Sequence, residues 1–303
     1  MEKSGCAGFS TFGRMSGGRS RFMIYVKCNH CGHDDTRLVQ QVDDTYRVVQ
    51  CRSCGLVYTN PIPDLHSLCD HYGENYYRDW IEKQSRARER MWRKRIREVM
   101  RHKQGGRLLD VGCGLETFLM LAKGQGFQVQ GTEVSSFITS QGREDEPPDI
   151  FRGELPEAQF PDKRFDVITL WHSLEHMPDP KRNLMEVHRI MKDDGLLVIA
   201  VPNLKNYFTR FFYRLYKRKK FSLFDPGAKE LHLFHFTPIS LPAMLHSVGF
   251  CVEQLRLDLS AVVFQRKIID WISGLVYAAT RANFADGFKI FARKSGHTAQ
   301  KAQ

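Results

Sequence analysis

Four cysteines form the most specific chemical pattern in this chain of 303 residues. Cys28 and Cys31 are separated by two residues, and Cys51 and Cys54 repeat that spacing further along the chain. Two such pairs supply four thiolates, which suits a tetrahedral Zn²⁺ site without an open coordination position. A zinc ion closed by four thiolates does no Lewis-acid chemistry, so we expect a structural zinc ribbon. The alternative is two redox-active or unpaired cysteine pairs.

A second set of residues has the spacing of a nucleotide-type cofactor site. Residues 107–135 read as a short apolar strand ending in Asp110, a turn at Gly112 and Gly114, a helix, and a second strand ending in Glu133. Glycines at such a turn let the backbone approach a ligand, and the N-terminus of a helix offers free N–H groups. An acid at the end of the second strand is placed to accept two hydrogen bonds from a ribose. The alternative is an ordinary strand–turn–helix unit that binds no ligand.

The spacing separates two cofactor classes. A dinucleotide fingerprint needs G-x-G-x-x-G, but Thr117 stands at its sixth position. The order Asp-x-Gly-x-Gly instead resembles motif I of the class I S-adenosylmethionine (SAM) methyltransferases, in which a third glycine usually stands where this chain has Glu116. The resemblance implies that SAM is bound by four residues of this stretch: Asp110, Gly112, Gly114 and Glu133.

A downstream block strengthens the resemblance. The run FDVITLWHSLEHMPDP at 165–180 looks like the methyltransferase group that includes ubiquinone-biosynthesis O-methyltransferases and sugar methyltransferases. A four-cysteine ribbon followed by a Pro-x-Pro segment is similar to bacterial members linked to surface-polysaccharide or nucleotide-sugar pathways. The resemblance spans residues 24–294. It implies further cofactor contacts at the ends of two strands, where an adenine-contacting acid often lies in these enzymes: Glu154 with Leu155, and Trp171.

Candidate catalytic residues follow the apolar run Phe165–Leu170 directly. Methyl transfer from a sulfonium is an in-line displacement, so the protein chiefly positions the nucleophile and removes its proton. His172 is the first candidate base and His232 the second, whereas His176 either takes part in catalysis or caps the next helix. In the resembling quinone methyltransferases an E-x-x-E-H segment here is associated with a divalent cation, and His172 replaces its first Glu. The order His-x-x-Glu-His also spells an inverted zinc-protease motif, which this strand-end context disfavours.

The alternation of strands and helices predicts the fold; for example, a helix over 182–191 is expected between buried strands over 165–170 and 195–201. We expect an α/β, Rossmann-like, mostly parallel seven-stranded methyltransferase sheet with helices on both faces, plus a small N-terminal zinc ribbon. The resemblance adds an antiparallel hairpin, to which 250–257 and 288–293 correspond. The expected organisation has five parts: a disordered tail at 1–22, the ribbon at 23–60, a helical linker or cap at 61–104, the methyltransferase domain at 105–294, and a disordered tail at 295–303.

Composition sets limits on the location and the partner. Hydrophobic content of 42% suits a globular core, and no apolar run is long enough to cross a membrane. The first residues lack the apolar region of a signal peptide, and Met23 is an alternative start to Met1. Eight cysteines without a secretory signal favour a reducing compartment, so we expect a protein that is cytoplasmic or peripheral at the membrane. A formal net charge of +11 indicates an anionic partner: phosphate, nucleic acid or a membrane surface.

Three functions remain open from the sequence. The first is a SAM-dependent methyltransferase that acts on a small molecule or a glycan, including a nucleotide-linked or lipid-linked sugar. The second is an RNA methyltransferase, which the ribbon and the basic charge favour. However, Pro202-Asn203 is only a fragment of the proline-rich amide-binding tetrapeptide that such an enzyme would carry. The third is a non-catalytic binding module with a degenerate cofactor motif, which Glu116 motivates.

The segment Leu204–Phe221 departs most from a minimal methyltransferase. Aromatic and basic residues alternate along it, and Phe208, Phe211 and Leu215 share one stripe of a helix. Three interpretations compete: an amphipathic lid packed on the core, a helix lying on anionic lipid, or a clamp for a pyrophosphate. The second and third agree if the acceptor is a lipid-linked glycan intermediate. Further on, 261–280 is expected to be an amphipathic helix. Residues 86–103 are rich in Arg and Lys, and we expect them to form a helix with a solvated basic face.

Overall fold

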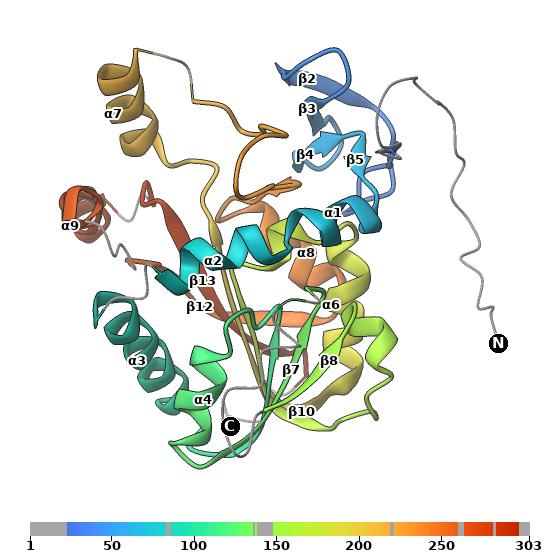
Figure 1. Ribbon diagram of the computed structural model, residues 1–303, viewed down its shortest axis with the longest axis vertical. Helices are drawn as coiled ribbons and strands as arrows, with labels where there is room; N and C mark the ends of the chain where they lie inside the picture. The colour runs from blue at the N-terminus through green and yellow to red at the C-terminus, as the bar shows by residue number, and fades with distance from the viewer. Residues whose placement is uncertain are drawn as a thin grey trace.

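A computed structural model of the chain describes residues 23–82, 86–135, 137, 148–218, 221–259, 264–280 and 283–296 (Figure 1). The tails expected at 1–22 and 295–303 lie outside these residues, except for 295–296. Lys219, Lys220 and residues 261–263 also lie outside them.

The centre of the molecule is the predicted seven-stranded sheet, whose strand order is β12-β13-β10-β9-β6-β7-β8. Neighbouring strands from β10 to β8 pair in parallel, whereas β13 is antiparallel to both β10 and β12. The mostly parallel methyltransferase sheet and its terminal hairpin are therefore confirmed. The strands are β6 (Gly106–Val111), β7 (Phe127–Glu133), β8 (Asp149–Arg152), β9 (Phe165–Trp171), β10 (Met191–Pro202), β12 (Phe250–Leu257) and β13 (Gly287–Lys294).

Helices cover both faces of this sheet. Along β10, Leu196 and Val198 belong to one apolar cluster, and Leu197 and Ile199 belong to the other. The first cluster includes side chains of α3 (Arg86–Met100) and α4 (Thr117–Lys123), and the second includes side chains of α6 (Pro180–Ile190) and α8 (Ser240–Ser247). Successive side chains of a strand point to opposite faces, so burial on both sides explains why these strands read as continuous apolar runs.

Two predicted boundaries need correction. We expected a helix over 182–191, but α6 begins at Pro180, because Asp179 caps it by accepting a hydrogen bond from the Arg182 amide at 2.9 Å. We also expected the next strand to begin at Gly195, whereas β10 begins at Met191 with an irregular register up to Leu196. Polar residues at its start hid this part of the strand.

The ribbon forms a second sheet, of order β11-β4-β3-β2. Its strands are β2 (Thr36–Gln41), β3 (Arg47–Cys51), β4 (Val57–Asn60) and β11 (Phe234–His235). Strand β4 lies inside this sheet, between β3 and β11. The Tyr58 and Phe234 rings stack at 6.0 Å between centroids, and both residues belong to the apolar cluster that also contains α6 and α8. The ribbon and the large sheet therefore share one core.

Short elements connect the two sheets. Strand β1 (Met23–Ile24) pairs with β5 (Ile62–Pro63), and the helices α1 (Leu65–His71), α2 (Glu74–Glu82) and α3 follow. These helices connect the ribbon to the large sheet. The remaining helices, α7 (Tyr207–Lys217) and α9 (Phe264–Thr280), lie at one corner of the molecule (Figure 1).

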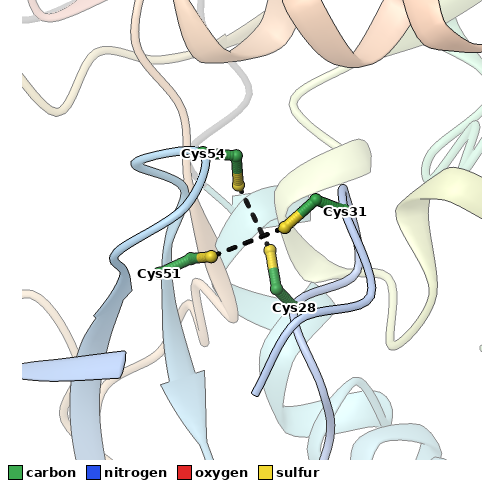
Figure 2. A group of neighbouring side chains, drawn as sticks. All are labelled: Cys28, Cys31, Cys51 and Cys54. Atoms are coloured by element: carbon green, nitrogen blue, oxygen red, sulfur yellow. Dashed lines mark hydrogen bonds between the residues drawn. The ribbon is translucent and has the colours of Figure 1, made fainter. Parts of the chain in front are cut away.

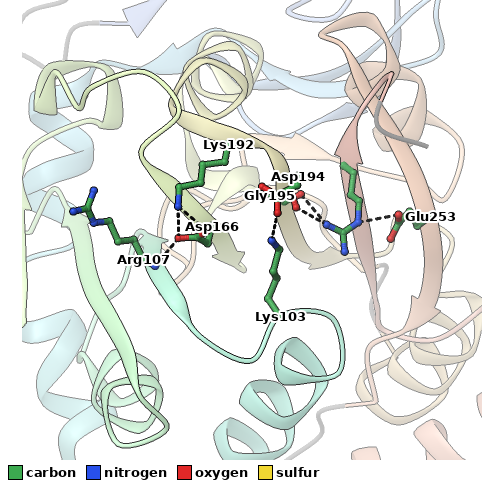
Figure 3. Close-up of polar contacts among 8 residues, drawn as sticks. Lys103, Arg107, Asp166, Lys192, Asp194, Gly195 and Glu253 are labelled. Atoms are coloured by element: carbon green, nitrogen blue, oxygen red, sulfur yellow. Dashed lines mark hydrogen bonds and ion pairs between the residues drawn. The ribbon is translucent and has the colours of Figure 1, made fainter. Parts of the chain in front are cut away.

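Charged side chains connect the strands where the parallel strands begin (Figure 3). The carboxylate of Asp166 accepts hydrogen bonds from the Arg107 amide at 2.9 Å and from Lys192 Nζ at 2.8 Å. Burial opposes the charge on Asp166, but these donors outweigh it and lower the pKa of the carboxyl. Arg293 donates to Glu253 Oε1 at 2.9 Å and to the Asp194 carbonyl at 2.7 Å. These contacts fix the edge of the sheet opposite the strand ends that carry the candidate site.

Candidate active site and cofactor pocket

A cavity of about 870 Å³ lies at the carboxyl ends of β6, β7 and β9. Ligands of open α/β sheets bind at this edge. The lining includes every residue that the sequence assigned to SAM or to catalysis: Asp110, Gly112, Gly114, Glu133, Glu154, Leu155, Trp171, His172 and His232. The fold therefore brings these separate motifs to one site.

The glycine turn after β6 lies against the end of β7. Gly112 has φ +72°, and a Cβ on it would lie 2.7 Å from Ser173 Cβ, so a side chain here would displace the residues after β9. The amides of Gly112 and Cys113 both donate to the Thr132 carbonyl, at 2.8 and 3.1 Å. Gly114 has φ +53° and donates its amide to Glu133 Oε2 at 3.0 Å. The turn and the acid of the motif thus form one hydrogen-bonded unit.

Glu133 is placed to accept hydrogen bonds from a ligand. Its side chain is buried at the end of β7 and accepts from the amides of Gly114 and Ser135, the latter at 2.9 Å. Burial raises the pKa of its carboxyl, and hydrogen bonds from these amides and from Tyr77 oppose the rise. Glu133 also lines the cavity, where its carboxylate can accept a hydrogen bond from a ribose hydroxyl.

Asp110 lies near the end of β6, just before the glycine turn. It is buried, and Thr169 Oγ1 of the neighbouring strand donates to Asp110 Oδ1 at 2.6 Å. Burial raises the pKa of the Asp110 carboxyl to about 7, although the hydrogen bond from Thr169 and the charge of Arg95 oppose the rise. The first acid of the motif therefore connects β6 to β9 at the cavity wall.

Glu116, which stands where the resembling motif has its third glycine, has the backbone conformation of a glycine. Glu116 has φ +60°, a left-handed conformation, and precedes α4 as its N-cap without a side-chain capping bond. Glycine adopts this backbone region readily, whereas other residues are strained there. The chain thus keeps at this position a backbone conformation that favours glycine, while carrying a carboxylate.

Glu154, Leu155 and Trp171 line the cavity from two strands, β8 and β9, that lie on opposite sides of β6 and β7. Glu154 precedes a short 3₁₀ turn, η1 (Leu155–Ala158), and its amide donates to Glu157 Oε2 at 2.9 Å. Burial, followed by the nearby charge of Glu157, raises the pKa of the Glu154 carboxyl. Leu155 is buried and lines the cavity, as does Trp171 at the end of β9.

Sequence reasoning missed a buried ion pair in the cavity wall, formed by Arg95 and Asp258. We expected the basic residues of 86–103 to face solvent, but Arg95 is only 3% exposed. Its guanidinium lies 4.8 Å from the ring centroid of Trp92 and 4.6 Å from that of Trp171, and Nη2 is 2.9 Å from Asp258 Oδ2. Lys289 Nζ lies 3.8 Å from the other oxygen of Asp258. The sequence indicates only one of these contacts, because Trp92 and Arg95 are three residues apart and therefore neighbours on the surface of one helix.

His172 contacts this ion pair. It has φ +55°, its Nε2 lies 3.0 Å from Asp258 Oδ2, and its Nδ1 lies 3.6 Å from Glu175 Oε1. Burial opposes a charge on the ring, but the hydrogen bond with Asp258 and the nearby carboxylate of Glu175 outweigh it and raise the pKa of His172 to about 9. The ring is therefore an imidazolium at neutral pH, and it must lose a proton before it can act as a base.

A second group of titratable residues faces the same cavity. Glu175, His176 and His232 place one ligand atom each within 4.8 Å of one another. His176 Nδ1 lies 2.8 Å from the Leu231 carbonyl, which can only accept, so Nδ1 carries the hydrogen. Burial lowers the pKa of His176, despite the charge of Glu175. A neutral ring with its hydrogen on Nδ1 leaves the Nε2 lone pair available for a proton or a cation.

The position of His176 corrects one alternative. It ends the short turn η2 (Leu174–His176), whereas the following helix α6 is capped by Asp179. His176 is therefore not the cap of that helix. The hydroxyl of Tyr72, a residue of the segment between the ribbon and the large sheet, lies 2.9 Å from the same Nδ1 atom of His176. Both carboxylate oxygens of Glu175 are buried without a hydrogen-bond partner, so this group is suited to a divalent ion or a polar acceptor.

The four cysteines predicted to bind zinc converge at the edge of the ribbon (Figure 2). The sulfur atoms of Cys28 and Cys54 are 3.4 Å apart, and those of Cys31 and Cys51 are 3.5 Å apart. Four sulfurs at about 2.3 Å from a tetrahedral zinc lie about 3.8 Å from one another, so the cluster is close to that size. Gly32 and Gly55, with φ near +77° and +78°, turn the chain after each pair. All four cysteines are free of disulfides.

The ribbon also touches the segment that bears the histidines. Asn29, between the first two cysteines, donates to Asp179 Oδ1 at 2.7 Å and accepts from the Lys181 amide at 2.8 Å. On the other side, the Thr59 amide of β4 donates to the Leu233 carbonyl at 2.8 Å, and the Leu233 amide donates to the Glu175 carbonyl at 2.9 Å. The strand next to His232 is thus held between the ribbon and η2.

Comparison with known proteins agrees with the fold. A model of the family described as "Methyltransferase domain" matches residues 82–255, so the chain belongs to this family. The protein is a SAM-dependent methyltransferase by its fold and family.

Curated relatives cover only part of the chain. A demethylmenaquinone methyltransferase of Lysinibacillus sphaericus is 27% identical over 166 residues, which are 50% of this chain and 70% of the relative. A demethylmenaquinone methyltransferase of Listeria welshimeri is 30% identical over 136 residues, 40% of this chain and 58% of the relative. Among solved structures, the PH0226 protein of Pyrococcus horikoshii covers 73% of this chain and 99% of its own at 18% identity, with a TM-score of 0.50. That likeness concerns the fold alone.

Proposed function

We propose that this protein transfers the methyl group of SAM to a small-molecule or glycan acceptor, which binds beside the three histidines of the cavity. The observation that carries the proposal is the continuity of the cavity. The glycine turn and Glu133 line one part of it, and His172, His176 and His232 line another. SAM supplies a methyl group already activated on a sulfonium, so the acceptor must be oriented and deprotonated within reach of that group.

In this proposal, His176 and His172 have different roles toward the acceptor. His176 is neutral and has a free Nε2, so it is a candidate to receive the acceptor's proton, directly or through a cation held with Glu175 and His232. His172, our first candidate from the sequence, is held as an imidazolium by Asp258 and Glu175. Its charge suits the stabilisation of an acceptor oxyanion, and it remains a candidate base only after deprotonation.

We propose that the four-cysteine cluster holds one structural Zn²⁺. Four thiolates with near-tetrahedral spacing support it, and they leave no position for a substrate. The ion would fix the loop of the first cysteine pair, Cys28 and Cys31, against Asp179, and the ribbon sheet against β11.

Two classes of acceptor are candidates. The named relatives make a demethylmenaquinone a second candidate acceptor beside a lipid-linked or nucleotide-linked sugar. The RNA alternative has less support, because the described exposed aromatic residues gather on α7 and α9 and do not follow a groove.

Calorimetric titration with SAM tests the proposal. Micromolar binding at one site per chain, lost on substitution of Glu133, is the expected result. Absence of SAM binding by folded protein would leave only the non-catalytic module. A screen of acceptors for methyl incorporation then separates quinols from sugars, and a fall in A260 after a high-salt wash would indicate bound RNA.

A further inference from the structure

One corner of the molecule exposes an unusual concentration of apolar side chains. Among the described residues, fourteen large hydrophobic side chains are exposed, and nine of them lie on α7, on α9 or at Phe221. Tyr216 is 84% exposed, Leu215 67%, and Trp271 of α9 66%. Large contiguous apolar surfaces on soluble proteins mark interaction sites. We call this surface, formed by the exposed side chains of α7 and α9 with Phe221, the α7–α9 surface.

The first turn of α7 holds the helix to the segment just before β13. Phe208 packs edge-on against Phe284 with ring centroids 5.8 Å apart, and Thr209 donates to Asp286. Residues 211–218 are all exposed, and no residue of α7 is buried. In Figure 1 the helix extends from the upper left of the molecule, away from the central sheet. The sequence left a packed lid as one alternative for this segment, but packing against the part of the chain that the structure describes does not account for these side chains.

The charge of the α7–α9 surface restricts its partner. Arg214, Lys217 and Arg218 are exposed among the aromatic residues, and no acidic residue occurs in the sequence between Asp194 and Asp225. On α9, the carboxylate-bearing Asp270 is buried, while Trp271 and Leu275 are exposed. Aromatic and aliphatic side chains mixed with cations, without acids, characterise helices that lie at an anionic membrane surface. Two copies of this chain facing one another here would bring like charges together.

The cavity reaches this same surface. Its lining includes Asn206, Thr209 and Arg210 of the α7 region and Phe221, together with the glycine turn at the other end. A molecule lying at the α7–α9 surface could therefore extend its head group toward the histidines without leaving the cavity.

We propose that the α7–α9 surface docks on an anionic lipid membrane, so that a lipid-anchored acceptor enters the cavity from the bilayer. The second half of this inference rests on the proposed methyl transfer, but the docking itself does not. Lys219 and Lys220 add to the positive charge of the segment in the sequence, although they lie outside the described residues.

The test is co-sedimentation of the full chain with two kinds of vesicle: phosphatidylcholine alone, and an equal mixture with phosphatidylglycerol. Wild type is expected to bind the mixed vesicles and to lose binding at high salt. A charge variant with Arg214, Lys217 and Arg218 changed to Gln should bind about 10- to 100-fold more weakly. An apolar variant with Phe211, Leu215 and Tyr216 changed to Ser should lose binding to a similar degree.

Matched controls use exposed residues elsewhere. Changing Arg93, Lys94 and Arg97 of α3 to Gln removes the same charge, and changing Met185 and Ile239 to Ser removes exposed apolar side chains. Both control variants should bind vesicles like wild type. All variants should bind SAM equally, because none of these residues lines the cavity.

Specific results would overturn the proposal. Wild type that does not sediment with mixed vesicles would refute docking, as would charge or apolar variants that bind like wild type. A concentration-dependent dimer that the apolar variant abolishes, without vesicle binding by wild type, would assign the α7–α9 surface to a second copy of the chain. Vesicle binding by a protein that binds no SAM would refute methyl transfer and leave the docking intact.

Discussion

Replacing Glu133 by Ala tests the cofactor site most directly. The carboxylate has two separate tasks in the proposal, since it accepts from the amides of Gly114 and Ser135 and would also accept from a ribose at the cavity wall. Hydrogen bonds to a charged group contribute about 1.5–3 kcal/mol each, so loss of those to a ribose should weaken SAM binding by at least this amount, or about 10- to 150-fold.

The same substitution should also lower stability. The Gly114 and Ser135 amides lose their acceptor in a buried place, which costs about 1–3 kcal/mol for each unsatisfied group. Removal of a buried charge offsets part of this loss, because burial raises the pKa of the Glu133 carboxyl. We expect a net fall of about 1–3 kcal/mol in the free energy of unfolding.

Calorimetry and urea unfolding measure the two effects separately. Glu89→Ala is a matched control, because it removes an exposed carboxylate from α3, outside the cavity lining. It should change neither SAM affinity nor stability by more than about 0.5 kcal/mol. If Glu133→Ala binds SAM as tightly as wild type while losing stability, Glu133 only supports the glycine turn and the ribose contact lies elsewhere. Unchanged values for both would refute the whole reading of this strand end.

Three further predictions address the zinc site, His172 and Glu116. Elemental analysis should find one zinc per chain. The Cys51→Ser variant should lose the metal and unfold the ribbon, whereas the control Arg52→Ser, at an exposed residue, should do neither. Four freely titrating thiols and no zinc would contradict this prediction. Because the folded-state pKa of His172, about 9, lies above its ordinary value of 6.5, its protonation stabilises the fold fully below pH 6.5 and the contribution is lost as pH rises through about 9. The difference in unfolding free energy between wild type and His172→Gln should therefore shrink between these pH values, and a constant difference would show that Asp258 and Glu175 do not hold the proton. Glu116→Gly should stabilise the protein by about 1 kcal/mol through relief of the left-handed backbone, with SAM affinity unchanged or higher; a fall in affinity would mean that the Glu116 carboxylate contacts the cofactor.

Much of the architecture could be predicted because its signals are local. Burial on both faces made β9 and β10 apolar runs, and the acid–glycine spacing from Asp110 to Gly114 identified the cofactor turn. The cavity lining brings the predicted residues together because parallel strands end at one edge.

What could not be predicted depends on distant contacts. Nothing near Arg95 in the sequence shows that Asp258 neutralises it, so its charge was assigned to solvent. The proton on His172 likewise depends on that same carboxylate, 86 residues further along the chain. The role of His176 required the position of the Leu231 carbonyl. Periodicity and spacing do not encode such pairings, since each joins residues that are far apart in the chain.

The strand pair between β4 and β11 has a consequence for synthesis of the chain. A ribosome makes residues 57–60 long before residues 234–235, which cover the outer edge of β4. Until then the growing chain presents an unpaired strand edge, with Tyr58 and Val57 exposed beside it. Such edges recruit other strands and lead to aggregation. Truncated forms that end before β11 should therefore need a chaperone to stay in solution, and residues 23–60 expressed alone should be a poor fragment for structural work even when supplied with metal.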